Sequence, residues 1–100
     1  MLSIPELEHL QEARTRLSGS LHRTPVASSR ALSERVGRPV FLKCENLQRT
    51  GSFKVRGALN RILELDNMAR GRGVATVSAG NHAQAVAWAA ARAGISATVI

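Results

Sequence analysis

The chain has 100 residues, 44% of them hydrophobic, which suits one small domain or a piece of a larger one. It has no apolar run of about 18 residues and no apolar stretch near the N-terminus, so we expect neither a membrane span nor a secretory signal. The single cysteine, Cys44, cannot form an internal disulfide, which favours a reducing cytoplasm. We expect no metal site.

The formal net charge of +7 raises nucleic acid as a possible partner. The basic residues are spread from Arg14 to Arg92 without a compact run. Only Phe41, Phe53 and Trp88 are aromatic, too few for a platform on which bases stack. We therefore expect no nucleic-acid binding, and a basic nucleic-acid-binding fragment remains the non-enzyme alternative.

A first helix is predicted near the N-terminus. Ser3 and Glu6 have the spacing of a capping box, and Pro5 is tolerated in the first turn. The helix should end near Ser18-Gly19, with His9 as a residue of its polar face. Its apolar face is expected to comprise Ile4, Leu7, Leu10, Ala13 and Leu17.

The following segment predicts an extended stretch and a short helix. Residues 21–27 should be extended, because the proline among them disfavours a helix before it. A serine at 28–29 is expected to cap a helix that Gly37 closes. Leu32 and Val36 should face inward from this helix.

Strands and helices then alternate to the last residue. The predicted elements are a strand at 40–44, a helix at 53–66, a strand at 74–77, a helix at 81–93 and a strand at 97–100. This order implies an α/β fold with parallel pairing and right-handed crossovers. Gly71 and Gly73 mark a loop before the second strand. Parallel strands are normally covered by helices on both faces, and the last strand lacks a following helix.

Lys54 occupies an unusual position for a lysine. With Ser52 as N-cap, Lys54 falls in the first helical turn, where the backbone dipole disfavours a cation. Partial desolvation beside Phe53 and Val55 would also favour the neutral amine, which Schiff-base chemistry with a carbonyl requires. On this residue alone, a solvated surface lysine is the more common interpretation.

The segment 78–84 lies between a predicted strand and helix, at the carboxyl end of the strand, where open α/β sheets place ligands. Gly80 permits close backbone approach, and the free N–H groups of the helix could bind an anion such as a carboxylate. The alternative is a plain strand-to-helix turn with Asn81 as N-cap.

Together, ENLQRTGSFKVRGA at 45–58 and SAGNHAQ at 78–84 resemble the fold-type II pyridoxal-phosphate enzymes, and within them the threonine dehydratases (threonine ammonia-lyases) and serine racemases. The resemblance runs from about Leu21 to the last residue. It implies an N-terminal fragment of a two-domain enzyme, with residues 1–50 in the larger domain and 51–100 beginning the smaller one. It also implies pyridoxal 5'-phosphate as cofactor, a small amino-acid substrate and a homo-oligomeric cytoplasmic protein.

The resemblance also assigns roles to residues. Lys54 is the expected Schiff-base anchor and catalytic residue, Phe53 would pack against the pyridine ring, and Asn81 would hydrogen-bond the ring hydroxyl. Arg56 is interpreted as a surface charge of its helix. The expected substrate loop comprises Ser78, Gly80, Asn81 and His82, with His82 contributing mainly backbone.

The implied reaction converts L-threonine to 2-oxobutanoate and ammonia, with L-serine to pyruvate as a second reaction. Serine racemase-, threonine synthase- and cysteine synthase-like enzymes remain alternatives. Serine racemases resembling this chain carry a serine at the position of Ala79, where alanine has no proton to donate. The 100 residues alone are expected to be inactive.

Overall fold

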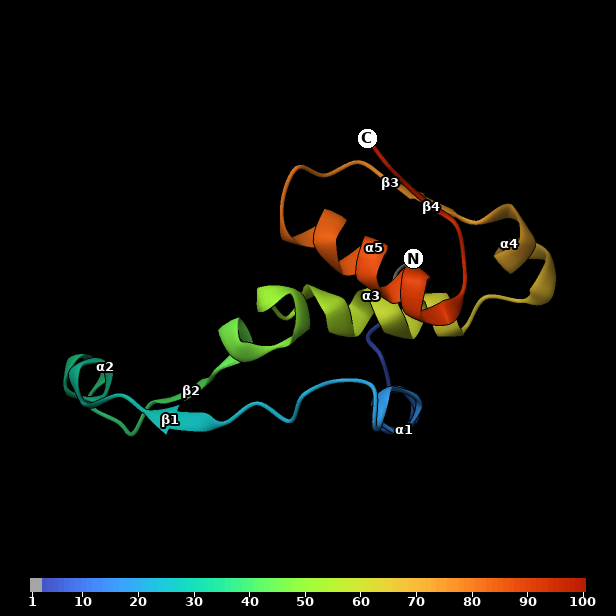
Figure 1. Cartoon of the computed structure of the whole chain (residues 1–100). Coiled ribbons are helices and arrows are strands. Elements are labelled where there is room, and N and C mark those ends of the chain that lie inside the picture. The colour runs from blue at the N-terminus through green and yellow to red at the C-terminus, as the bar shows by residue number, and fades with distance from the viewer. Residues whose placement is uncertain (1–2) are drawn as a thin grey trace.

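The structure is a computed structural model that describes residues 3–100, with extents of 51 × 31 × 31 Å (Figure 1). Its elements, in chain order, are α1 (Leu7–Leu17), β1 (Val26–Ser28), α2 (Arg30–Val36), β2 (Phe41–Lys43), the 3-10 helices η1 (Glu45–Leu47) and η2 (Arg49–Gly51), α3 (Lys54–Leu63), α4 (Asn67–Arg72), β3 (Val74–Thr76), α5 (Asn81–Ala93) and β4 (Ala97–Val99). The α/β class expected from the sequence is confirmed.

The core lies between α3 and α5, which pack against each other. Residues spaced three and four apart bring one apolar face of each helix to this interface. The small side chains on α5 let the two helices approach closely, so its alanine-rich face lies mainly against α3 and less against the sheet. The buried residues are Val55, Ala58, Leu59 and Ile62 of α3, Ala85, Val86, Ala89 and Ala90 of α5, and Ile95.

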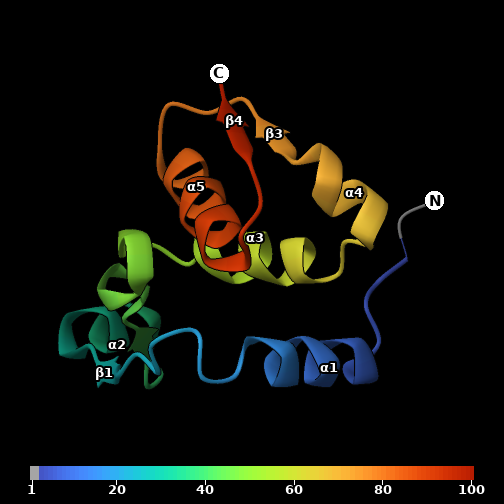
Figure 2. The same ribbon diagram turned by 45° about the vertical axis from the view of Figure 1, so that its right-hand side comes forward.

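The last two strands form a parallel pair, as the strand–helix–strand order predicts. Val74 pairs with Ala97 and Thr76 with Val99, and α5 makes the crossover between the strands. Figure 2 shows β3 and β4 side by side with α5 beneath them. The carboxyl end of β3 therefore leads directly into the loop before α5.

The predicted parallel pairing is wrong for the strand at 40–44. This strand, β2, forms a separate antiparallel pair with β1, in which Val26 faces Lys43 and Ser28 faces Phe41. The short helix α2 returns the chain beside β1, and the pairing is extended by the hydrogen bond from Ser29 N to Val40 O at 3.0 Å. Figures 1 and 2 show this unit reaching to one side of the α3–α5 core.

Helix α1 begins later than the capping box predicted at Ser3 would place it. Glu6 has an extended backbone (ψ 159°) and stands at the N-cap, so the helix starts at Leu7. His9, expected only on the polar face, accepts the Glu6 N–H through Nδ1 at 3.2 Å. The expected apolar face is largely exposed within the described residues, since Leu7 and Leu10 are 68% and 57% exposed.

Two further local predictions need correction. Helix α2 is capped by Ser29 and closed by Gly37 as expected, but Leu32 and Val36 are exposed and do not face inward. The expected loop at 71–73 is partly helical, because the Asp66 side chain accepts the Ala69 N–H at 2.8 Å and starts α4.

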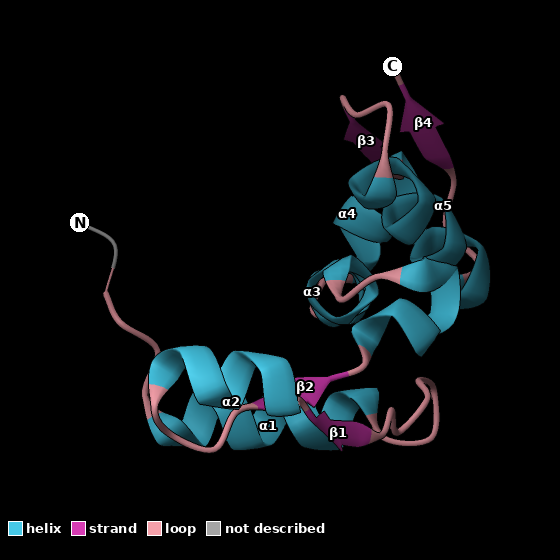
Figure 3. Ribbon diagram, turned by 90° about the vertical axis from the view of Figure 1, so that its left-hand side faces the viewer, coloured by secondary structure: helices cyan, strands magenta, loops and turns pink. Residues whose placement is uncertain are grey.

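Figure 3 shows α1, β1 and β2 below the part of the molecule that contains α3, α4 and α5.

Candidate active site

Lys54 stands at the start of α3, as the sequence predicts. The N-cap of this helix is Phe53 and not Ser52 as predicted, although the buried Ser52 hydroxyl accepts the Lys54 N–H at 3.4 Å. The side chain of Lys54 is exposed, with Nζ 5.2 Å from the centre of the Phe53 ring. Phe53 is itself 60% exposed, so the expected desolvation is not provided by the described residues.

The turn before Lys54 uses left-handed backbone at two successive residues. Gly51 has φ 75°, which glycine tolerates, but Thr50 has φ 62° and is the described non-glycine residue with a positive φ. A β-branched residue is rare in this region, because its side chain crowds the backbone. The Thr50 hydroxyl is also buried without a hydrogen-bond partner in the described part of the chain. This strained turn redirects the chain into the first turn of α3.

The second motif forms the loop between β3 and α5. Ser78 N donates to Ile100 O at 3.1 Å, which extends the parallel pairing to the beginning of the loop. Gly80 N donates to the Ser78 hydroxyl at 3.2 Å, and Gly80 itself is the N-cap of α5. The alternative with Asn81 as N-cap is therefore wrong, because Asn81 is already helical. No heavy atom lies within 4 Å of where a Gly80 Cβ would be, so this backbone is open to a ligand.

The two motifs meet through their helices. The N-terminal ends of α3 and α5 lie on the same, left-hand side of Figure 1, and the two helices pack side by side. Lys54 thus lies at the start of α3, and the loop 78–82 leads into the start of α5. Asn81 is exposed, while the exposed His82 lines a mainly apolar cavity of about 240 Å³ between α3, β3 and α5.

A partly buried ion pair lies close to Lys54 in the sequence, and the sequence pattern does not indicate it. Arg56 donates to both carboxylate oxygens of Glu45, from Nε at 2.7 Å and from Nη2 at 2.8 Å. It is therefore not the free surface charge that its helical position indicated. These hydrogen bonds, with one from the Thr24 hydroxyl at 2.6 Å, lower the pKa of Glu45 to about 2, and the same ion pair raises the pKa of Arg56.

Gln48 makes a second polar connection in the same motif. It is 4% exposed, its Nε2 donates to His22 O at 2.8 Å, and its Oε1 accepts the N–H groups of His22 and Arg49, each at 3.0 Å. The sequence contains one weak signal for these contacts, because the segment 45–52 is rich in polar residues and has no apolar periodicity. The partner His22, however, lies 26 residues earlier.

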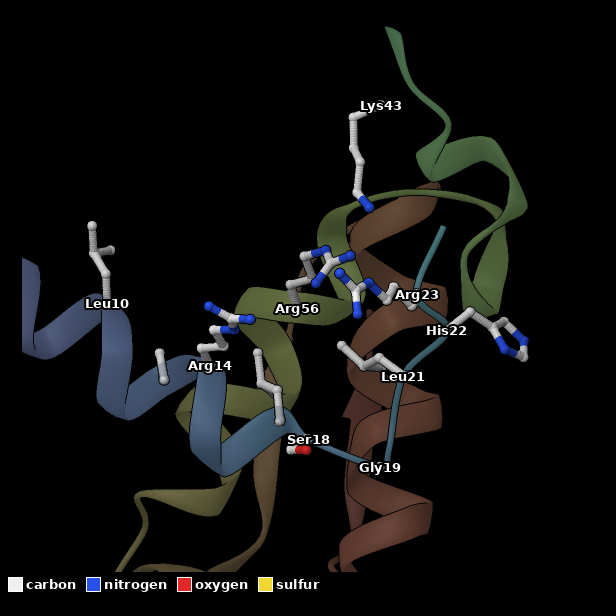
Figure 4. Close-up of a pocket in the computed structure, with 11 residues that line it drawn as sticks. Leu10, Arg14, Ser18, Gly19, Leu21, His22, Arg23, Lys43 and Arg56 are labelled. Atoms are coloured by element: carbon white, nitrogen blue, oxygen red, sulfur yellow. The ribbon is translucent and has the colours of Figure 1, made fainter. Parts of the chain in front are cut away.

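The other lysine occupies a different environment. Lys43 Nζ donates to Thr24 O at 2.6 Å, so its amine is held by the backbone. Lys43 and Arg56 line a cavity of about 550 Å³ beside α1, which Arg14 and Arg23 also enter (Figure 4). Lys54 is not among its lining residues, so this basic cavity is separate from the candidate active site.

Within residues 3–100, no three His, Cys, Asp or Glu side chains gather as metal ligands. None of the helices in that range has the length and apolar character needed to cross a membrane.

Comparison with known proteins then decides the family. Residues 17–100 match the model of the pyridoxal-phosphate dependent enzymes. The chain belongs to this family. Its fold is that of the N-terminal part of fold-type II members, and its cofactor is pyridoxal 5'-phosphate.

Relatives with different activities are similar to this family member. It is 53% identical over 94 residues to an L-threonine ammonia-lyase of Thermotoga maritima, covering 94% of the chain and 23% of the relative. It is 51% identical over 89 residues to an L-threo-3-hydroxyaspartate ammonia-lyase of a Pseudomonas species, covering 89% and 28%. The structure of maize serine racemase superposes with a TM-score of 0.87 at 44% identity, covering 97% of the chain and 30% of the racemase. The chain thus spans about a quarter of the length of these curated relatives.

The residues of this pyridoxal-phosphate enzyme fit the cofactor. The aldehyde of pyridoxal 5'-phosphate needs a reachable primary amine. Lys54 Nζ is exposed and has no hydrogen bond to any residue from 3 to 100. The flat ring of the cofactor needs an apolar face, which the exposed ring of Phe53 beside that amine offers.

Proposed function

We propose that the protein containing this chain is an ammonia-lyase that converts L-threonine to 2-oxobutanoate and ammonia, with L-serine to pyruvate as a second reaction. The observation that carries the proposal is the free amine of Lys54 beside Phe53. This amine lies at the same end of the α3–α5 core as the loop 78–82 before α5. The 53% identity to an L-threonine ammonia-lyase supports this choice of substrate.

Pyridoxal 5'-phosphate, when bound, supplies an aldehyde that anchors the substrate amine and a conjugated ring that accepts electrons from the substrate Cα. Lys54 would hold the cofactor covalently, Phe53 would cover one face of its ring, and the Asn81 amide would contact the ring hydroxyl. The exposure of all three side chains is compatible with these roles.

The loop 78–82 would bind the substrate carboxylate. Gly80 leaves the backbone accessible, and the N-terminus of α5 is not capped by a described side chain, so its N–H groups and its positive dipole end favour an anion. Ser78 would add its hydroxyl, and His82 its backbone.

Lys54 would act as the base that removes the Cα proton of the substrate. Once released by the incoming substrate amine, the Lys54 side chain can accept that proton, and departure of the Cβ hydroxyl completes the elimination. Across the complete reaction, one L-threonine gives one 2-oxobutanoate and one ammonia. No second base is required for this outcome.

Ala79 favours elimination over racemisation. Racemisation needs a proton donor on the face opposite to the lysine, and the methyl group of Ala79, in the loop after β3, cannot supply a proton. Serine racemase remains the second candidate, because the similarity to the maize enzyme is high over the whole chain.

The assay uses the complete gene product loaded with cofactor. L-threonine and L-serine are supplied separately. The keto acids 2-oxobutanoate and pyruvate are measured by liquid chromatography, and D-serine by chiral chromatography. We expect both keto acids and little D-serine. D-serine formed as fast as pyruvate would reject the proposed lyase function. The variant Ala79→Ser should introduce racemisation of L-serine.

We also propose the context of the whole protein. Residues 1–50 would belong to a larger domain and 51–100 would begin a smaller one, in a cytoplasmic homo-oligomer. Limited proteolysis and sedimentation of the complete protein would test the domain boundary and the assembly.

A further inference from the structure

Glu45 and Arg56 connect the segment before Lys54 with the helix that carries it. Glu45 begins η1 and its side chain is 14% exposed, while Arg56 lies two residues after Lys54 on α3. The two hydrogen bonds between them, at 2.7 and 2.8 Å, form a planar fork that fixes orientation as well as distance. We call this pair the clamp.

The clamp closes a loop that contains Lys54. The segment between Glu45 and Arg56 passes through η1, η2 and the strained turn at Thr50-Gly51 before it enters α3. One end of the clamp is itself anchored, because the Thr24 hydroxyl donates to Glu45 Oε1 at 2.6 Å. The first turn of α3 is thereby tied to a second segment of the chain.

Apolar packing orders this loop only at its α3 end, where Val55 is fully buried in the core. Neither η1 nor η2 contains a buried residue, and Leu47 is 57% exposed. Polar contacts therefore hold the part of the loop before α3, namely the clamp, the hydrogen bonds of the buried Gln48 to His22, and Arg49 over the Trp88 ring. Removing the clamp should loosen the segment from η1 to Lys54, while Val55 and the rest of the α3–α5 core remain packed.

We propose that Glu45 and Arg56 are positioning residues for Lys54. The clamp sets the position of the first turn of α3, and so keeps the Lys54 amine where it meets the cofactor aldehyde and the substrate Cα. This inference rests on the proposed role of Lys54. Displacement by about 1 Å can cost a reaction as much as a hundredfold in rate, so a firm clamp matters for catalysis.

The test uses the complete protein and two variants of the clamp. Glu45→Gln keeps the size of the side chain but removes its charge, and Arg56→Lys keeps the charge but removes the fork. Glu34→Gln is the matched control, because Glu34 and Arg30 form an ion pair of the same type at 2.8 Å on α2, with both side chains largely exposed. Glu45→Asp replaces Glu45→Gln if that variant does not fold.

Two readouts separate positioning from simple stabilisation. Amide hydrogen exchange of residues 46–54, measured without cofactor, should rise at least roughly tenfold in both clamp variants and remain unchanged in the control. The rate of cofactor capture, followed by visible absorbance, and kcat for L-threonine should each fall by at least roughly tenfold, with KM changed by less than about twofold.

Capture rates and kcat values within about twofold of wild type would overturn the proposal, even with faster exchange, because the clamp would then be structural only. Unchanged exchange would overturn it as well. If wild type captures no cofactor at Lys54, the proposed function fails instead, and the exchange measurement still reports whether the clamp orders this turn.

Discussion

Gly73 lies so close to Ser96 that a Cβ added to the glycine would stand 2.7 Å from the Ser96 carbonyl oxygen. That oxygen also accepts the Val74 N–H at 2.9 Å and so begins the parallel pairing of β3 with β4. Gly73 has φ 77° and ψ −170°, a conformation that is essentially restricted to glycine. The close approach therefore sets where the sheet beside the candidate site starts.

Gly73→Ala should destabilise the protein. Strained backbone and the clash with Ser96 together should lower the free energy of unfolding by about 2 to 4 kcal/mol. Gly71→Ala is the control, because Gly71 lies in α4 with no heavy atom within 4 Å of an added Cβ, and alanine there should stabilise by up to about 1 kcal/mol. Urea unfolding of both variants measures the difference, and equal midpoints would contradict the account.

The close contact of α3 and α5 predicts a second pair of variants. Ala89 is fully buried at this interface, so Ala89→Leu should overpack it and cost about 1 to 3 kcal/mol. Ala87 is exposed on the same helix, and Ala87→Leu should change stability by less than about 0.5 kcal/mol. Thermal unfolding followed by circular dichroism compares them. A larger loss for Ala87→Leu would place the packed face of α5 elsewhere.

The Glu45–Arg56 ion pair predicts a pH dependence of stability. The pKa of Glu45 is about 2 in the folded protein and near 4.5 otherwise, so folding favours the ionised form. This contribution is complete above about pH 4.5 and is lost as the pH falls toward 2, and its upper limit is roughly 3 kcal/mol. Glu45→Gln should therefore flatten the fall in stability between pH 4.5 and 2. Parallel curves for wild type and variant over that interval would rule out this contribution.

Helix α5 and strand β3 could be predicted because their signals are local. The helix at 81–93 has the expected bounds, and Gly94 closes it with φ 68°. By contrast, the pairing of β2 with β1 depends on where α2 returns the chain, which neither strand encodes by itself. Helix α4 was missed because two glycines within four residues indicated a loop, whereas the Asp66 side chain is sufficient to start a short helix.

The residues of the candidate site also divide into those that the local sequence indicates and those that it does not. Lys54 and Gly80 could be found because each lies at a recognisable junction between elements. The clamp could not, because Glu45 and Arg56 are eleven residues apart, a spacing that belongs to no regular element. Only the 3-10 turns and the left-handed turn at 50–51 bring the two side chains together.

The most direct test of the account is the identity of the lysine that binds the cofactor. The complete protein is loaded with pyridoxal 5'-phosphate, reduced with borohydride, digested and mapped by mass spectrometry, with Lys54→Ala in parallel. Lys43 is the internal control, because its amine already donates to the Thr24 carbonyl at 2.6 Å. We predict that the cofactor mass is found on Lys54 alone and that Lys54→Ala neither retains it nor turns over L-threonine. Cofactor found on Lys43, or turnover by Lys54→Ala near the wild-type rate, would contradict the central claim.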